Sequence, residues 1–408
     1  MTTDKAMQPL IVPRLQYENH QWSPSTDYIS RSERIRETGP YRSALVPAIA
    51  ERQFSIPQEV AADLEESARA LGEFDSYADI KLGTKGNALG PMSSILLRTE
   101  STSSSQIENL TVGAKQLSLQ VLGEGHGGNA AIVAGNVKAM ESALVFANTL
   151  DEQHLLSMHK ALLSEQYGFE QYAGKLRTTL VWVGGSQHGP RNAKYVAPQY
   201  QYLHGYLTDL FAFLHRDDMP VIFQCAIAHA QFETIHPFVD GNGRVGRALI
   251  HAVLRNKGLT RKSTPLLSAA LLTDTERYFD ALTQYRAGDA RAIVERLNFA
   301  CRFAQRTGTQ LIDNLCEELD DAKRALHGVR SDSAAWTVLP VLIEQPTINV
   351  EYLTKRLGLA PVTARRALNT LVDHKVASHT MGGRRNEVWE HKGIIAALNN
   401  YSAELRRA

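Results

Sequence analysis

The sequence predicts a mainly α-helical protein with one central β-hairpin and a C-terminal winged helix-turn-helix. Most of the chain repeats apolar residues at helical spacing, as in IPQEVAADLEESARALGEF from residue 56. The strongest strand signal before residue 330 is LRTTLVWVGG, where β-branched and aromatic residues run into Gly184 and Gly185. After residue 330, three helical patterns are followed by a hairpin pattern around Gly382 and Gly383.

The order of these patterns divides the chain into four parts. Residues 1–45 are polar and lack apolar periodicity, so we expect an extended or partly ordered arm, with regular structure beginning after Pro47. Residues 46–125 are predicted to form a helical module with a Ser/Thr-rich lead-in, TESTSSSQIENL, and a glycine-rich end, GEGHGGN. A helical core with the hairpin is expected over residues 126–328, and the winged helix-turn-helix over residues 329–408.

Composition excludes several classes of protein. The chain has 408 residues, of which 43% are apolar, and its 44 Lys and Arg balance 43 Asp and Glu, so no overall basic field attracts nucleic acid or an anionic membrane. Cys225, Cys301 and Cys316 lie far apart, each without a CxxC partner, which disfavours disulfides and zinc. We find no signal peptide and no stretch of 18 apolar residues, and so expect a cytoplasmic protein with no membrane partner.

The most informative string is HPFVDGNGRVGR, residues 236–247, which lies between two helical patterns and begins the second. Gly241, Asn242 and Gly243 tolerate a tight backbone that turns successive N–H groups toward one point, and the helix that follows adds its positive dipole end. Arg244 and Arg247 are three residues apart, so both can hold phosphate oxygens from one face. The string therefore predicts an anion-binding loop.

Two further residues of the string suit catalysis. Asp240 offers a hard oxygen ligand for Mg²⁺, and His236 stands where it can accept a proton from a Ser, Thr or Tyr hydroxyl that attacks phosphorus. The alternative is a structural loop that caps a helix. A histidine, an acid, a glycine turn and two arginines in one short loop favour function.

The string resembles the signature of Fic-domain proteins, HxFx(D/E)GNGRxxR, without a mismatch at any defined position. The similarity extends from about Tyr41 to Arg302 through the segments AHAQFETIHPF, AGKLRTTLVWVGG and RYFDALTQY. It implies a helical Fic core that transfers AMP from ATP with Mg²⁺ and releases pyrophosphate. His236 would be the base, Asp240 the metal ligand, residues 241–243 the anion hole, and Arg244 and Arg247 the phosphate ligands.

The same resemblance assigns residues around the nucleotide. The flap beside the nucleotide would be Val183, Gly184, Gly185 and Ser186, and its edge would pair with an extended segment of the target protein. Tyr278 and Phe279 would lie by the adenosine. Both are equally consistent with ordinary core aromatics on a helix.

An inhibitory pattern precedes the signature. Ser104 and Glu108 are four residues apart, on one face of a predicted helix, and Asn109 follows, which matches the family's pattern (S/T)xxxE(G/N). The protein thus resembles the class with an N-terminal inhibitory helix, in which Glu108 would pair with Arg247 and deny it to the γ-phosphate. A solvated helix face is the bland alternative. The same glutamate could instead help water attack an AMP-modified target, which would make the enzyme a de-AMPylase.

Other polar residues carry less weight. His159 and His229 fall on apolar helix faces and are interpreted as buried, hydrogen-bonded core residues. Lys175 and Arg177 lie near the flap, where either contact with substrate or solvation is consistent with the sequence.

The C-terminal module has two open interpretations. TARRALNTLVDHK would be its recognition helix, with Arg365 and Arg366 facing outward and Arg384 and Arg385 in the wing. From residue 331 to 408 there are ten Lys and Arg and seven Asp and Glu, a net charge of +3, which is weak for DNA binding. A protein-interaction or dimerisation domain is the alternative.

These observations favour an autoinhibited protein adenylyltransferase whose partners are ATP and a target hydroxyl, on another protein or on itself. A homodimer is left open. A Fic enzyme that transfers another group fits less well because the GNGR glycine pattern is intact. A nucleotide-sensing, DNA-binding regulator fits less well because it would not need His236.

Overall fold

The computed structural model describes residues 9–24, 29–82, 91–145, 147–164, 166–380, 387–405 and 407. These residues are mainly helical, as predicted, and gather into two compact units. The first unit comprises Met1–Glu66, Ser142–Lys257 and Glu276–Asn298, and the second comprises Ser67–Glu141, Gly258–Thr275 and Phe299–Ala408. Each unit is built from three separate chain segments, so the four sequential parts stay a prediction.

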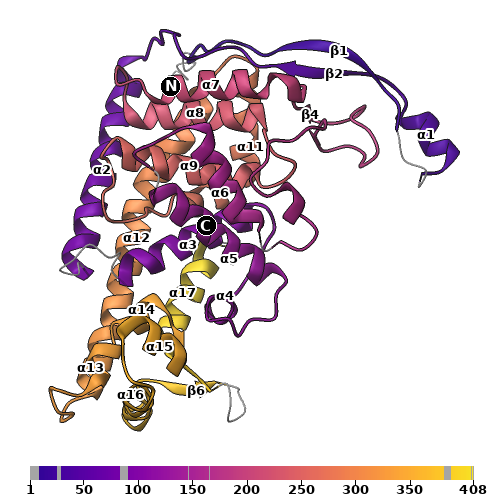
Figure 1. Ribbon diagram of the computed structural model, residues 1–408. Coiled ribbons are helices and arrows are strands. Elements are labelled where there is room, and N and C mark those ends of the chain that lie inside the picture. The colour runs from indigo at the N-terminus through magenta and orange to yellow at the C-terminus, as the bar shows by residue number, and fades with distance from the viewer. Residues whose placement is uncertain are drawn as a thin grey trace. The chain divides into compact units, whose positions relative to one another are not determined.

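The first unit is built around a buried central helix. Every residue of this helix from Ile222 to Ile235 is buried, as expected for a sequence that is apolar on all sides. Gly246 of the next helix allows close packing, because a Cβ there would lie 2.9 Å from Phe232 Cδ1. The helices concerned, seen together in Figure 1, are α6 (Glu152–Leu163), α7 (Leu203–Leu214), α8 (Val221–Ile235) and α9 (Asn242–Asn256).

Further helices complete this unit and continue beyond it. The elements are α11 (Thr275–Arg286), the first turns of α2 (Gln58–Leu82) and α12 (Arg291–Ala325), and the short 3₁₀ helices Glu170–Tyr172 and Tyr200–Tyr202. Within the described residues, no helix is long and apolar enough to cross a membrane.

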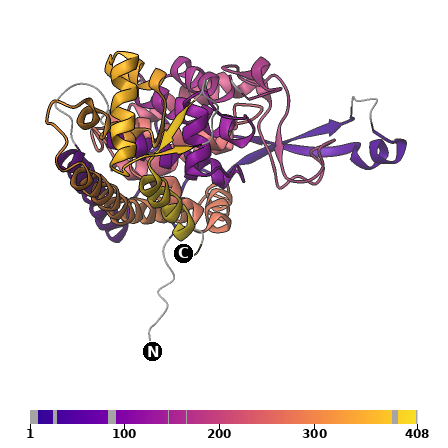
Figure 2. The ribbon, with the colours of Figure 1, turned by 90° about the horizontal axis from the view of Figure 1, so that it is seen from below.

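Residues before Pro47 are more regular than the sequence predicts. They form a two-stranded antiparallel ribbon of β1 (Gln16–Trp22) and β2 (Gly39–Leu45), with α1 (Arg31–Glu37) between the strands in sequence (Figure 2). The expectation that regular structure starts after Pro47 is therefore wrong. Polar side chains occupy both faces of the ribbon, so the alternation that reveals a half-buried strand is missing.

The central hairpin is present but short. β3 (Trp182–Val183) pairs antiparallel with β4 (Tyr195–Val196), and Gly184 and Gly185 turn the chain with φ of 76° and 77°. Trp22 of the ribbon packs edge-on against Trp182, with ring centroids 5.5 Å apart. The N-terminal ribbon therefore packs against the central hairpin.

In the second unit, the predicted Ser/Thr-rich lead-in is part of a helix. The hydroxyls of Thr99, Thr102 and Ser105 donate to backbone carbonyls four residues earlier, at 2.8, 2.8 and 2.9 Å. This bonding satisfies hydroxyl groups that would otherwise disfavour a buried helix. The helices here are α3 (Pro91–Ile107), α4 (Ala114–Val121), α5 (Asn129–Val145) and α10 (Leu267–Leu272).

The C-terminal part of this unit contains the predicted helices and strands in the predicted order. Pro340 divides the first expected helix in two, and a short strand, Thr347–Ile348, joins the hairpin strands in the order β5-β7-β6. The elements are α13 (Ala334–Val338), α14 (Val341–Glu344), β5 (Thr347–Ile348), α15 (Val350–Leu357), α16 (Pro361–Asp373), β6 (Ser378–Thr380), β7 (Val388–Glu390) and α17 (Lys392–Leu405).

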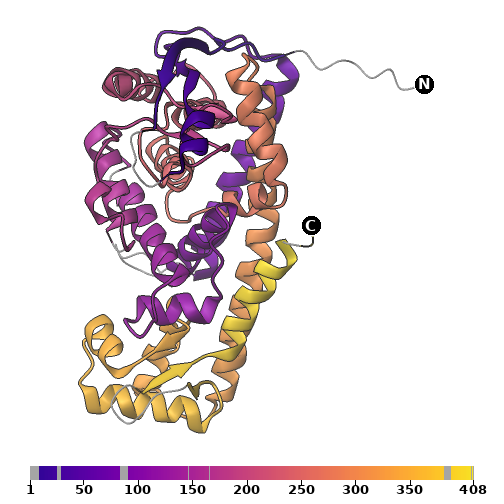
Figure 3. The ribbon, with the colours of Figure 1, turned by 90° about the vertical axis from the view of Figure 1, so that its right-hand side faces the viewer.

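The assignment of these elements as a winged helix stays a prediction. Arg365 and Arg366 are exposed on α16, as expected. The predicted turn at Gly382 and Gly383, with Arg384 and Arg385, lies outside the described residues. α17 runs beside the C-terminal half of α12 (Figure 3), where the hydroxyls of Thr307 and Tyr401 are 3.3 Å apart.

Candidate active site

His236 ends helix α8 in an unusual backbone conformation. Its φ and ψ are 50° and 60°, the left-handed region that a residue with a side chain rarely adopts. Its imidazole Nδ1 lies 3.3 Å from the carbonyl oxygen of Glu233 and 3.9 Å from that residue's carboxylate. Both of these groups accept hydrogen bonds, so Nδ1 carries the proton and Nε2 is the basic nitrogen.

Arg177 holds the chain around His236. Its Nε donates to the carbonyl of His236 at 2.8 Å, and its two terminal nitrogens donate to the carbonyls of Thr179 and Pro198. Its backbone N–H donates to Pro237. The side chain is 2% exposed, and burial lowers the pKa of Arg177 to about 10. Of the two roles left open for it, neither substrate contact nor solvation fits this burial.

A second arginine caps the same helix end. Arg286 donates from Nη2 to the carbonyl of Glu233 at 3.2 Å and stacks 3.8 Å above the ring of Tyr195. The Tyr195 hydroxyl donates to the carbonyl of Thr234, and burial raises the pKa of this tyrosine. The last carbonyls of a helix have no partner within the helix. Here they bond two cations and a hydroxyl, which also complement the negative end of the dipole.

The loop between α8 and α9 is closed by one side chain. Oδ1 of Asn242 accepts from the backbone N–H of Phe238, and Nδ2 donates to the carbonyl of the same residue, both at 2.9 Å. Gly241 precedes α9 with φ of 82°, and a Cβ there would lie 2.6 Å from Leu162 Cδ2. Glycine is therefore required at 241 for its conformation and for space.

The buried side chain of His159 in α6 contacts this loop by a hydrogen bond and by ring stacking. Its Nε2 donates to the carbonyl of Asp240 at 3.1 Å, and its Nδ1 accepts from the N–H of Gly174 at 3.1 Å. The ring stacks on Phe238 with centroids 3.7 Å apart. Burial lowers the pKa of His159 to about 4. The interpretation of His159 as a buried, hydrogen-bonded core residue agrees with these contacts, but its support of the loop was not predicted.

Asp240 and the two arginines lie at the start of α9. Oδ2 of Asp240 accepts from Gln166 Nε2 at 2.9 Å and from Arg244 Nη2 at 3.1 Å. The Asp240 side chain is 37% exposed, and its Oδ1 has no hydrogen bond to a described residue. Arg244 and Arg247 are buried, at 3% and 2% exposure.

These contacts suit one carboxylate ligand for Mg²⁺. Among the described residues there is no group of three His, Cys, Asp or Glu side chains that could enclose a metal. Mg²⁺ typically binds through one or two carboxylates together with substrate phosphates and water. The partly exposed carboxylate of Asp240 fits that kind of site.

The predicted flap residues lie in the β3–β4 hairpin. Val183 is 44% exposed, and the carbonyl of Ser186 accepts from Trp182 Nε1 at 2.8 Å. Within the described residues, β3 pairs only with β4, so its other edge has no strand partner. The two aromatic residues expected near the adenosine differ, because Phe279 is 48% exposed whereas Tyr278 is 1% exposed.

Tyr278 is part of the core as the structure stands. Its hydroxyl lies 2.7 Å from Nε2 of His229, which is also buried. Burial, with the positive charge of Arg247, lowers the pKa of His229 to about 3. The interpretation of His229 as a core residue agrees with this contact.

The inhibitory residues belong to the second unit. Ser104 is fully buried in α3, as the predicted helix requires. That helix ends at Ile107, so the prediction that Glu108 also lies on it is wrong, and Glu108 lies in the turn that follows. The turn bonds Glu108 N–H to the carbonyl of Ser105 at 3.0 Å, and Asn109 takes a left-handed φ of 61°. Asn adopts this conformation more readily than most residues, which explains why the helix ends here.

The buried histidines predict acid-sensitive stability. His159 and His229 have folded pKa values below the ordinary 6.5, so the unfolded chain binds more protons below that pH. The contribution of these two histidines to the free energy of unfolding is therefore complete above pH 6.5 and is lost as the pH drops toward 4. For His159 we expect a loss of roughly 2 kcal/mol between pH 6.5 and 4.5. Urea unfolding at both pH values measures it.

The control compares a buried with an exposed histidine. His159→Gln should lower stability at pH 7 but flatten the decline toward pH 4.5. His204→Gln, at a site whose side chain is 77% exposed, should leave the decline unchanged. Equal pH dependence in wild type and His159→Gln would contradict the assignment.

Comparison with known proteins places the central residues in a family. Residues 149–254, which contain the α8–α9 loop, match the Fic/DOC family. Protein adenylyltransferase fic-1 of Caenorhabditis briggsae is 32% identical over 170 residues, which are 39% of this chain and 30% of that protein. A probable protein adenylyltransferase of Aquifex aeolicus (strain VF5) is 42% identical over 78 residues, 19% of this chain and 22% of that protein. The matched regions span less than a third of either relative.

A solved structure extends the likeness of the fold. A Fic family protein from Desulfovibrio desulfuricans G20 has a TM-score of 0.52 at 21% identity and covers 83% of this chain and 97% of that chain. At this identity the likeness shows the fold alone. The helical core with its hairpin flap is of the Fic type, and the chain carries a Fic/DOC-family domain at residues 149–254.

Proposed function

We propose that the protein transfers AMP from ATP to a hydroxyl of a target protein, itself included. The observation that carries the proposal is the α8–α9 loop, which fixes His236 at one end and the N-terminus of α9 at the other. The pairing of Asn242 with Phe238 closes this loop at 2.9 Å on both sides. Relatives named as protein adenylyltransferases support the same activity.

The start of α9 would hold the triphosphate. The backbone N–H groups of residues 241–243 and the positive end of the helix dipole attract anions. Arg244 and Arg247 add two buried cations with planar donors, which suit phosphate oxygens. Asp240 would hold Mg²⁺ through Oδ1, and the metal would neutralise phosphate charge when bound.

His236 would act as the general base. The target hydroxyl oxygen attacks the α-phosphorus, and Nε2 of His236 accepts the hydroxyl proton. The bond from the α-phosphorus to the oxygen of pyrophosphate breaks, and pyrophosphate leaves. Glu233 keeps the proton on Nδ1, so that Nε2 is the nitrogen with the lone pair.

The flap would position the target. The free edge of β3, next to exposed Val183, would bond an extended target segment by main-chain pairing. Phe279 is exposed enough to contact the adenosine, whereas Tyr278 would contact it only if its bond to His229 opened.

Glu108 would restrain this activity. Its carboxylate would pair with Arg247 and remove that arginine from the γ-phosphate, while Ser104 would anchor the segment from within α3. The left-handed turn at Asn109 places Glu108 at a helix end, where local opening requires little energy. The same residues also allow the opposite activity, removal of AMP from a modified target.

The C-terminal module would bind a protein or DNA partner.

Removal of the Glu108 carboxylate should reveal which group the protein transfers. Because Glu108→Gly removes the inhibitory carboxylate, this variant incubated with ATP and Mg²⁺ should gain the mass of AMP on itself or on a target. The gain should exceed that of the wild type at least about tenfold. Intact-protein mass spectrometry measures it.

His236→Ala in the Glu108→Gly background is the control and should abolish the gain. A phosphate adduct would instead indicate a kinase-like Fic enzyme. Equal labelling of wild type, Glu108→Gly and the double variant would refute both the role of His236 as the base and the role of Glu108 as the inhibitor.

A further prediction concerns Arg177, which positions His236 without a role in binding ATP. In the Glu108→Gly background, Arg177→Lys keeps the charge but loses the planar fork that reaches three carbonyls. We expect kcat to fall about 10- to 100-fold with little change in the KM for ATP. Steady-state kinetics of pyrophosphate release measures both constants.

Arg216→Lys is the matched control. Arg216 also donates to backbone carbonyls, those of Ala50 and Arg52, but has no contact with the α8–α9 loop. Its kcat should stay near that of the parent. A rise in KM with unchanged kcat in Arg177→Lys would show that Arg177 acts on binding instead.

A further inference from the structure

The segment that carries Glu108 connects two helices of the second unit. α3 ends at Ile107 and α4 begins at Ala114. Within the intervening residues, Leu110 and Val112 pack on a buried cluster formed by Leu117 of α4 and by Val133 and Ala134 of α5. The position of Glu108 therefore depends on how α3 is held relative to α4 and to the start of α5.

One side chain from the C-terminal region joins these two helices. Oε1 of Gln345 accepts a hydrogen bond from Arg98 of α3, and Nε2 of Gln345 donates to the carbonyl of Ser118 of α4 at 2.7 Å. Gln345 is fully buried, and Ser118 is 3% exposed. A buried amide that satisfies both helices is costly to remove, because each partner would lose its hydrogen bond.

The neighbouring residue, Glu344, contacts α15 as well as Arg98. The carboxylate of Glu344 pairs with Arg356 of α15, through Nε at 3.0 Å and Nη2 at 2.9 Å, and accepts from the Tyr352 hydroxyl at 3.0 Å. Its backbone carbonyl accepts from Arg98. Glu344 and Gln345, here called the 344–345 bridge, thus connect α15 to α3 and α4 through adjacent residues.

Further polar contacts bind α4 to the C-terminal strands and helix. Ser118 Oγ accepts from the N–H of Thr347 at 3.0 Å, and Lys115 pairs with Glu390 of β7 at 2.6 Å. The N–H of Ala114 donates to Asn399 of α17 at 3.2 Å. α4 is thus held by β5, β7 and α17.

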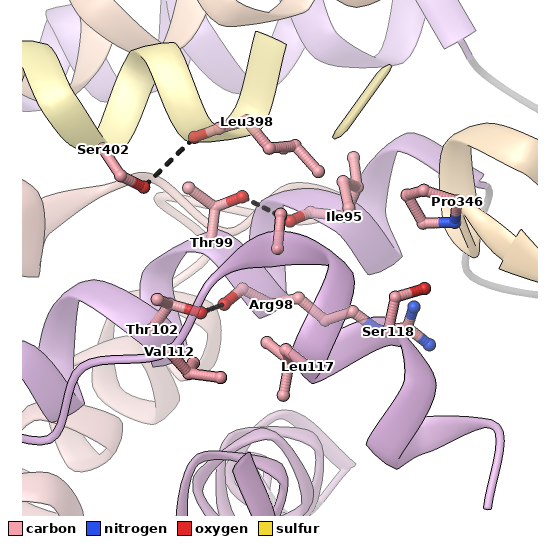
Figure 4. Close-up of a pocket in the computed structure, with 11 residues that line it drawn as sticks. Ile95, Arg98, Thr99, Thr102, Val112, Leu117, Ser118, Pro346, Leu398 and Ser402 are labelled. Carbon is pink, nitrogen blue, oxygen red and sulfur yellow. Dashed lines mark hydrogen bonds between the residues drawn. The ribbon is translucent and has the colours of Figure 1, made fainter. Parts of the chain in front are cut away.

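Apolar packing between these elements is incomplete. Figure 4 shows a cavity between α3, α4, α17 and the turn at Pro346, with Ile95, Leu117 and Leu398 on its walls. Its volume of about 40 Å³ has room for a few water molecules but not for a metabolite. The polar contacts of the 344–345 bridge lie beside this cavity and add to the packing of the buried faces of α3 and α14.

We propose that the 344–345 bridge couples the C-terminal helix pair α15–α16 to the segment that carries Glu108. A partner that moves α15 pulls on Glu344, withdraws Gln345 from Arg98 and Ser118, and loosens the connection between α3 and α4. The segment 108–113 then opens and the inhibition is released. This inference rests on the proposed function for its effect on activity, but the structural coupling can be measured without activity.

The test uses Gln345→Ala in the full chain, with Glu351→Ala as the matched control. Glu351 lies on α15 and, among the described residues, pairs only with Lys355 at the surface, outside the bridge. Amide deuterium exchange of residues 108–113 should quicken in Gln345→Ala and stay unchanged in Glu351→Ala. AMP transfer should rise about tenfold in Gln345→Ala with Glu108 intact, within the range typical of coupled sites.

A double variant separates release of inhibition from a general effect. Gln345→Ala should add nothing further in the Glu108→Gly background, since the inhibitor is already absent. Tyr352→Phe, which removes one hydrogen bond from Glu344, should act in the same direction more weakly and serves if Gln345→Ala unfolds. Unfolding is recognised by a lost thermal transition.

The outcomes distinguish the two ideas. Unchanged exchange of residues 108–113 in Gln345→Ala and in Tyr352→Phe overturns the coupling. An equal rise in AMP transfer caused by Gln345→Ala in the wild-type and Glu108→Gly backgrounds overturns it too. Faster exchange without AMP transfer by any variant, Glu108→Gly included, keeps the coupling and overturns the proposed function.

Discussion

The paired hydrogen bonds between the Asn242 side chain and the backbone of Phe238 are the interaction on which the candidate site depends. They close the loop between α8 and α9, so the basic histidine and the anion-binding helix end are parts of one rigid turn. The turn tolerates no Cβ at Gly241, because Leu162 of α6 fills that space. A longer or looser loop would let His236 and the helix N-terminus move apart, and the proposed transfer requires His236 to reach the attacking hydroxyl while the helix end holds the phosphates.

Around this turn, backbone carbonyls are partners for two arginines, the buried Arg177 and the half-buried Arg286. Arg177 bonds only carbonyl oxygens among the described residues, and Arg286 bonds the carbonyl of Glu233. Carbonyl partners hold the backbone without adding a carboxylate that would compete for Arg244 or Arg247. The strained conformation of His236 is thereby fixed from both sides, as is common where a site is organised before its substrate binds.

The sequence predicts what is local and misses what is not. HPFVDGNGRVGR predicts the loop because its partners lie within a few residues of one another. Arg177 and His159 were not assigned to the loop because their partners are 59 and 81 positions away. The ribbon before Pro47 lacks apolar alternation, although the Ser30–Glu33 capping box was a readable signal for α1. The predicted helix includes Glu108 and so runs one residue too far, although Asn109 was a readable stop signal because asparagine tolerates the left-handed conformation.

The contrast between the two regions bears on the proposed inhibition by Glu108. The α8–α9 loop is held by short-range bonds within one chain segment and by side chains buried in the core. The segment that carries Glu108 is held by α3 and α4, which are joined through a buried amide more than two hundred residues away in sequence, beside a small cavity. Opening the second arrangement requires Gln345 to give up its hydrogen bonds to Arg98 and Ser118. None of these bonds involves the α8–α9 loop, so the proposed switch can change state while that loop keeps its geometry.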